Sequence, residues 1–124
     1  MTITELQALT HDALNELAAK CMGWHKGAKE YWRDKNNYAK YNYEGWDGHE
    51  SGMIDYWCPA YYLDHAAILE AEIARCGLQD VYFQTVQELW RNVPVRVGFA
   101  WFLMTAPPHL RTVAAVHVLQ GEAQ

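Results

Sequence analysis

The sequence predicts a small α+β fold, a single domain over residues 1–124 in which a mostly antiparallel sheet is packed between helices. Two segments, 10–22 and 64–76, place apolar residues at helical spacing. The stretch 28–57 and the stretch 95–104 alternate apolar or aromatic residues with polar or small ones, as half-buried strands do. A chain of this length, 51% apolar, is long enough for one hydrophobic core.

The first helix is expected over residues 10–22. Thr10 can cap its amino end, and Gly23 follows its last turn. Thr4 and Gln7 have capping-box spacing, which allows an earlier start.

The clearest helix is expected over residues 64–76. Asp64 is the predicted N-cap and Gly77 the residue that ends the helix. Its apolar residues lie on one face and its charged residues on the other, so one face should lie on the core.

Short strands are expected within residues 28–57, because aromatic and polar residues alternate there. Three glycines, Gly45, Gly48 and Gly52, punctuate a polar segment between these strands and predict a loop.

The pattern of residues 81–91 fits both a strand and a helix, and we favour a helix. Pro94 interrupts the chain after it. Residues 95–104 then alternate in the manner of a strand whose far end is buried on both faces.

The last helix is expected over residues 107–120, with Pro108 at its first position. This segment carries little polar surface, so the helix is either enclosed in the core or half-covered by another subunit. Together with the apolar end of 95–104, it leads us to expect a homo-oligomer.

Composition and charge exclude several classes of function. The formal net charge of −5 argues against long duplex nucleic acid or an anionic membrane as the partner. The amino end carries no signal-peptide pattern and no apolar stretch approaches the roughly 18–20 residues of a membrane span, so we expect a cytoplasmic protein. Cys21, Cys58 and Cys76 form no metal-binding or redox motif and are expected to be reduced thiols.

Three segments carry motifs of one known family. LNELAAKCMGW at 14–24 is a helical segment that ends in Met-Gly-Trp, and APPHLRTVAAVHVL at 106–119 is an Ala-rich final helix. A central segment combines a Trp, a Pro and a capped Ala-rich helix, at Trp57, Pro59, Tyr61, Asp64, Ala66 and Ala67. Together these segments resemble the phage ABA sandwich domain family. The resemblance implies a three-layer α/β/α sandwich encoded by a bacteriophage or prophage, in a family whose functions are mostly unknown.

The chain departs from the family pattern at two places. Pro107 stands where the family usually has a capping Thr, which leaves Thr105 as the candidate cap of the last helix. Tyr62 and Leu63 replace the usual Ser-Thr before Asp64.

No catalytic, metal or cofactor motif is present, so we expect a protein that is not an enzyme. The loop residues Asp47, His49, Glu50 and Asp55 offer metal-ligand atoms, but glycine-flanked acids are usually only solvated. An acid–base site drawn from the 47–55 loop and His25 is the remaining enzymatic alternative.

The unusual feature is the density of aromatic residues between 31 and 62, which holds more than half of the aromatic residues of the chain. Tyr and Trp give large contact area at low entropic cost, so interfaces favour them. The residues expected to form a binding surface are Tyr31, Trp32, Arg33, Tyr41, Tyr43, Trp46, Tyr56 and Tyr61.

Together with the phage origin that the family resemblance implies, this surface favours a non-enzymatic phage accessory protein that counteracts a host system by binding a host protein. One alternative is a small-ligand binder that sequesters a nucleotide-type immune signal, since aromatic rings beside cations also suit a nucleotide. A half-buried sheet with aromatic residues along its edge is the structural alternative.

Overall fold

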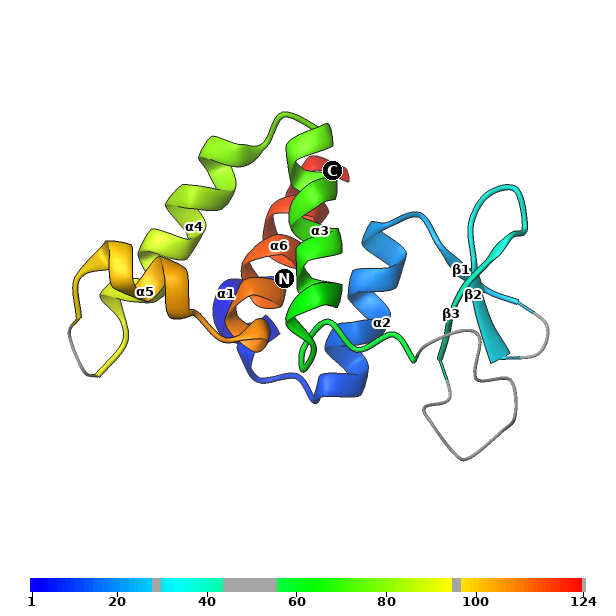
Figure 1. Cartoon of the computed structure of the whole chain (residues 1–124), viewed down its shortest axis with the longest axis horizontal. Coiled ribbons are helices and arrows are strands. Elements are labelled where there is room, and N and C mark those ends of the chain that lie inside the picture. The colour runs from blue at the N-terminus through cyan, green and yellow to red at the C-terminus, as the bar shows by residue number, and fades with distance from the viewer. Residues whose placement is uncertain (28–29, 44–55, 95–96, 124) are drawn as a thin grey trace.

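The computed structural model describes residues 1–27, 30–43, 56–94 and 97–123 (Figure 1). Its helices are α1 (Ile3–Gln7), α2 (His11–Cys21), α3 (Leu63–Arg75), α4 (Gln79–Arg91), α5 (Phe99–Thr105) and α6 (Pro108–Ala123). Its strands are β1 (His25–Lys26), β2 (Tyr31–Arg33) and β3 (Ala39–Asn42). The predicted α+β class is confirmed.

Helix α6 is the centre of the core. It packs against α1, α2, α3 and α4, and Val113, Ala114, Ala115 and Val116 are fully buried. The low polarity of this helix is therefore explained by burial within its own chain, which was one of the two expected outcomes. The homo-oligomer stays a prediction that no longer depends on α6.

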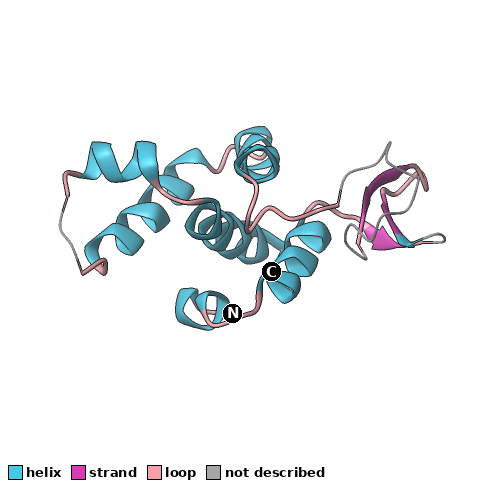
Figure 2. Cartoon of the chain, turned by 60° about the horizontal axis from the view of Figure 1, so that its bottom comes forward, coloured by secondary structure: helices cyan, strands magenta, loops and turns pink. Residues whose placement is uncertain are grey.

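The three strands form one antiparallel sheet in the order β1-β2-β3. The register shifts between Trp32 and Arg33, as in a β-bulge. The sheet lies at one end of the helical bundle, next to α2 (Figures 1 and 2). The described helices lie to one side of it, whereas the family resemblance implied helices on both sides.

The amino-terminal caps explain why α1 and α2 are separate helices. The Thr10 side chain accepts a hydrogen bond from the backbone of Ala13, so the predicted cap of α2 is confirmed. The predicted pairing of Thr4 with Gln7 is wrong, because the capping box is formed by Thr2 and Glu5 instead.

The predicted end of α3 is confirmed and its predicted cap is wrong. Gly77 has a φ of +73°, a left-handed conformation that glycine adopts without strain. Asp64 lies in the first turn, and Tyr62 at the N-cap position makes no capping hydrogen bond through its side chain. The Asp64 carboxylate still stabilises the positive end of the helix.

Residues 81–91 are helical, as favoured, but the strand predicted at 95–104 is wrong: its second half is the helix α5. Nearly every residue of this segment is apolar, so its pattern fits either period. Packing decides the outcome, because the Phe99 ring contacts the rings of Phe83 and Trp90 at 5.1 and 5.3 Å.

The start of α6 is held by Arg111 rather than by a Thr cap. Pro108 is the first residue of α6, as predicted, and the Thr105 hydroxyl donates back into its own helix α5. The Arg111 guanidinium donates to the carbonyl of Ala106 and pairs with Glu70 at 3.2 Å. These contacts fix α6 against α3 and the end of α5.

Within the described part of the chain, no helix combines the length and apolar character that crossing a membrane requires. The three cysteines are not joined in disulfides, in agreement with their expected thiol form.

Two histidines meet where α2 and α6 begin, and they predict a loss of stability in acid. His11 and His109 stack with ring centroids 5.3 Å apart. Burial, and then the charge of His11, lower the pKa of His109. In the unfolded chain the His109 imidazole takes up a proton near pH 6.5, whereas in the folded chain it does so only at lower pH. The free energy of unfolding therefore falls as the pH drops below about 6.5.

We expect urea denaturation at pH 7.5 and 5.5 to show a smaller pH dependence in His109→Gln than in the wild type. His25→Gln, which changes an exposed histidine, is the matched control. An equal pH dependence in His109→Gln and the wild type would contradict this account.

Candidate functional site

Asn15 of α2 anchors the segment that leads into α3. Its side chain is buried, accepts a hydrogen bond from the Ala60 N–H at 3.1 Å and donates to the Cys58 sulfur at 3.2 Å. Its backbone carbonyl accepts from the Trp57 indole at 3.0 Å. Asn15 thus makes three hydrogen bonds to this segment.

Trp57 is the centre of an aromatic cluster between the sheet and the helices. Its ring centroid lies 4.9 Å from those of both Trp24 and Tyr41, and 5.4 Å from that of His65. His65 Nδ1 accepts a hydrogen bond from the Cys58 N–H at 3.0 Å. These contacts attach the small sheet to the helical bundle.

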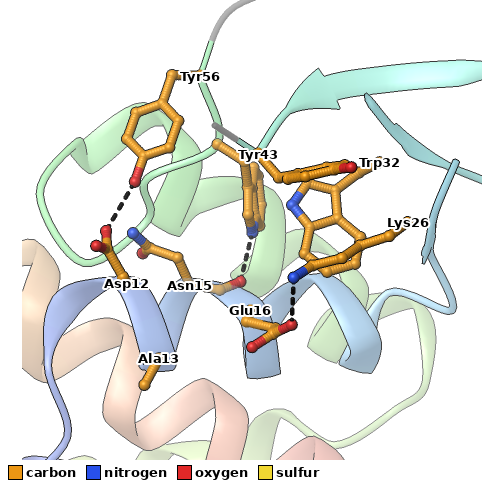
Figure 3. A pocket seen from close by; sticks show the side chains of 9 residues that line it. Asp12, Ala13, Asn15, Glu16, Lys26, Trp32, Tyr43 and Tyr56 are labelled. Carbon is orange, nitrogen blue, oxygen red and sulfur yellow. Dashed lines mark hydrogen bonds and ion pairs between the residues drawn. The ribbon is translucent and has the colours of Figure 1, made fainter. Parts of the chain in front are cut away.

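A pocket of about 370 Å³ opens between α2 and the sheet (Figure 3). We call it the α2–sheet pocket; it is lined by Asp12, Ala13, Asn15, Glu16, Lys26, Trp32, Tyr43, Tyr56 and Trp57. The helix supplies the carboxylates, and the sheet and the segment before α3 supply the aromatic rings.

Two polar contacts cross this pocket (Figure 3). The Tyr56 hydroxyl donates to Asp12 at 2.9 Å, and the Lys26 ammonium lies 2.8 Å from a Glu16 oxygen. Burial, with the hydrogen bond to Asp12, raises the pKa of Tyr56 to about 12. The hydrogen bond from Lys26 lowers the pKa of Glu16. The Tyr56 phenol is therefore protonated at neutral pH, and the Glu16 side chain is a carboxylate.

The Lys26 ammonium also lies over two rings. It is 5.1 Å from the ring centroid of Tyr43 and 5.7 Å from that of Trp32. These two rings meet at 66° with their centroids 5.7 Å apart. Both distances lie within the range of a cation–π interaction.

Three of the predicted binding residues, Trp32, Tyr43 and Tyr56, line the pocket together. Trp32 is buried, while Tyr43 and Tyr56 are half-buried. Trp46 lies outside the described residues.

The other predicted residues lie elsewhere. Tyr41 belongs to the cluster around Trp57, and Tyr31 lies under the Arg33 guanidinium at 5.7 Å. Tyr61 is 67% exposed and contacts the ring of Tyr62 edge to face. Since Tyr62 contacts His65, which stacks on Trp57, ring contacts connect the exposed tyrosines to the pocket wall.

The sequence analysis missed the polar half of the pocket. Asp12 and Glu16 are four residues apart, a spacing that places both on one helical face and was available as a signal. Nothing in the sequence signalled that Lys26 would join them, because its place depends on the sheet packing beside α2.

The buried Cys58 thiol is not activated for nucleophilic attack. Burial raises the pKa of Cys58, whereas a cysteine nucleophile needs its pKa lowered by a nearby positive charge. His65 receives the Cys58 backbone N–H at Nδ1, so this ring atom has a structural role.

The described residues do not form the acid–base site of the enzymatic alternative. His25 is exposed on β1, and the 47–55 loop, with the metal-ligand candidates Asp47, His49, Glu50 and Asp55, lies outside the residues that the structure describes. Within the described ranges, no group of three or more His, Cys, Asp or Glu side chains is arranged to hold a metal ion.

A second surface lies at the opposite end of the molecule (Figure 1), on α4 and α5. Phe83, Trp101 and Met104 are 47%, 61% and 75% exposed. Beside them is a mainly apolar pocket of about 210 Å³ lined by Glu70, Ile73, Gln79, Tyr82, Phe83, Val86 and Leu103. We call this the α4–α5 patch.

Comparison with known proteins gave no match to a family model, a curated protein or a solved structure. The resemblance to the phage ABA sandwich family therefore stays an expectation, and function is argued from the site.

Proposed function

We propose that this chain is a non-enzymatic binding protein whose partner is another protein, held on the aromatic surface around the α2–sheet pocket. The observation that carries this proposal is the pocket itself. It brings Trp32, Tyr43 and Tyr56 together between the sheet and the carboxylates of α2.

The composition of this surface is that of a protein interface. Half-buried Tyr43 and Tyr56 and exposed Tyr61 offer large rigid contact areas with polar tips. The pocket is fixed by the hydrogen bonds of Asn15, so little ordering is needed when a partner binds.

The charge of the pocket supports a protein partner over the nucleotide-type ligand. The pocket lining contains two acidic side chains, Asp12 and Glu16, and one basic side chain, Lys26. Carboxylates repel phosphate groups. The chain as a whole carries a net charge of −5, which further favours a basic partner.

The raised pKa values of Cys58 and Tyr56 support a role without catalysis. Neither group is ionised at neutral pH, and neither is therefore prepared to act as a nucleophile or base.

The biological setting follows from the family resemblance alone. We propose that the protein is phage-encoded and acts in the host cytoplasm, where it counteracts a host system by occupying a host protein. If it forms a homo-oligomer, the exposed residues of the α4–α5 patch, Phe83, Trp101 and Met104, provide the apolar surface.

The test is recovery of a host protein on tagged protein from bacterial lysate. The double variant Tyr43→Ala with Tyr61→Ala should reduce recovery about tenfold or more, because aromatic residues at the centre of interfaces carry much of the binding energy. The matched control is Phe83→Ala with Trp101→Ala at the other end of the molecule, and circular dichroism checks folding of both. If the control variant loses the partner and the pocket variant keeps it, the surface is misplaced.

A further inference from the structure

The Lys26 ammonium occupies a site that three different elements build. Glu16 comes from α2, Trp32 from β2 and Tyr43 from the residue after β3. The ammonium contacts the carboxylate at 2.8 Å and faces both rings within 5.7 Å. A carboxylate and two angled aromatic faces are the groups that bind an organic ammonium ion. We call Glu16, Trp32 and Tyr43 the ammonium site.

Lys26 reaches this site on a side chain that solvent also contacts. Its side chain is 50% exposed and reaches the site through a flexible four-carbon stem. The place of the Trp32 ring does not depend on the ammonium, because Trp32 is buried and its backbone lies in register with Lys26 on one side and with Tyr41 on the other. Solvent can therefore receive the Lys26 ammonium when another cation arrives.

Withdrawal of Lys26 would leave the pocket negatively charged. Asp12 and Glu16 would then face it without a counter-charge from the pocket lining. This balance attracts a cation and repels a phosphate.

We propose that the ammonium site takes a lysine side chain of the partner protein and that Lys26 is its internal competitor. This inference rests on the proposed function and names the group that the pocket recognises. A primary ammonium on an alkyl stem fits the site, since Lys26 itself is such a group. While Lys26 is seated, only the fraction of molecules with an open site binds, so the internal lysine weakens the apparent affinity.

The proposal is tested on the isolated protein with n-butylammonium chloride, which copies the end of a lysine side chain. The Trp32 indole N–H is followed by ¹⁵N nuclear magnetic resonance during the titration. In Lys26→Ala the shift should reach half of its maximum at a concentration about tenfold lower than in the wild type, as expected if Lys26 is seated about nine-tenths of the time. Sodium chloride at equal ionic strength controls for screening, and n-butanol controls for the alkyl stem.

Two variants make the result specific. Lys35→Ala removes an exposed lysine of the turn between β2 and β3, outside the ammonium site, and should respond like the wild type. Adding Glu16→Gln to Lys26→Ala should abolish the gain in affinity. Equal responses of Lys26→Ala and Lys35→Ala would overturn the proposal, as would equal shifts with n-butanol and n-butylammonium.

The outcome is separable from that of the proposed function. If n-butylammonium does not bind preferentially to Lys26→Ala but partner recovery still depends on Tyr43 and Tyr61, the lysine-binding inference fails alone. If the recovery experiment fails and the ammonium binds as expected, the pocket is an ammonium site whose ligand is not that protein partner.

Discussion

Replacing Trp57 with Ala is expected to lower the free energy of unfolding by about 3–5 kcal/mol, the usual cost of removing a buried aromatic side chain. Trp57 is 1% exposed and contacts the rings of Trp24, Tyr41 and His65. The substitution also removes the indole donor to the Asn15 carbonyl. It therefore opens a cavity where the sheet joins the helices.

Urea denaturation followed by circular dichroism measures this loss. Trp101→Ala is the matched control, because the Trp101 side chain is 61% exposed and its loss should cost no more than about 0.5 kcal/mol. Equal losses in the two variants would mean that Trp57 does not hold the sheet to the bundle.

Replacing Asn15 with Ala is expected to cost about 2–3 kcal/mol, because it leaves the buried Ala60 N–H without its side-chain acceptor. The variant also loses the donor to the Cys58 sulfur. The segment that carries Trp57 and Tyr56 should then be held less firmly, so the pocket should lose definition along with stability.

Asn36→Ala is the control for this prediction, since Asn36 is exposed and its backbone N–H, rather than its side chain, bonds to Asp34. Hydrogen exchange of the Ala60 amide should accelerate in Asn15→Ala and stay unchanged in Asn36→Ala. An Ala60 amide that remains equally protected in both variants would contradict the anchoring role of Asn15.

Local signals predicted the start of α2 and the end of α3, because caps and glycine stops act within a few residues, whereas the predicted cap at Asp64 was wrong. Thr10 and Gly77 are of this kind, and both act as expected. The segment 95–104 was misassigned because a nearly continuous apolar run fits both periods. Its helical second half is stabilised by the distant Phe83, whose ring contacts Phe99, and the sequence does not show such contacts.

The sequence analysis identified only the aromatic half of the candidate site, although the four-residue spacing of Asp12 and Glu16 on α2 was an available signal for its acidic part. Residue type alone indicated Trp32, Tyr43 and Tyr56, because density of Trp and Tyr is a compositional feature. The roles of Asn15 and Lys26 arise when α2 and the sheet meet, and each makes contacts with residues outside its own element. The spacing of residues within one segment does not predict contacts of this kind between two elements.

Site-specific cross-linking would show directly which surface of this protein a partner contacts. The photoreactive residue p-benzoylphenylalanine would replace Tyr43 at the α2–sheet pocket in one version of the protein, and Phe83 at the α4–α5 patch in another. Both would be irradiated in the bacterial cells that make them. We expect a discrete cross-link to a host protein from position 43, reduced by adding Tyr61→Ala, and none to a host protein from position 83, where only a second copy of this chain is expected. A host protein cross-linked from position 83 alone would place the binding surface on α4 and α5 and contradict the proposed function.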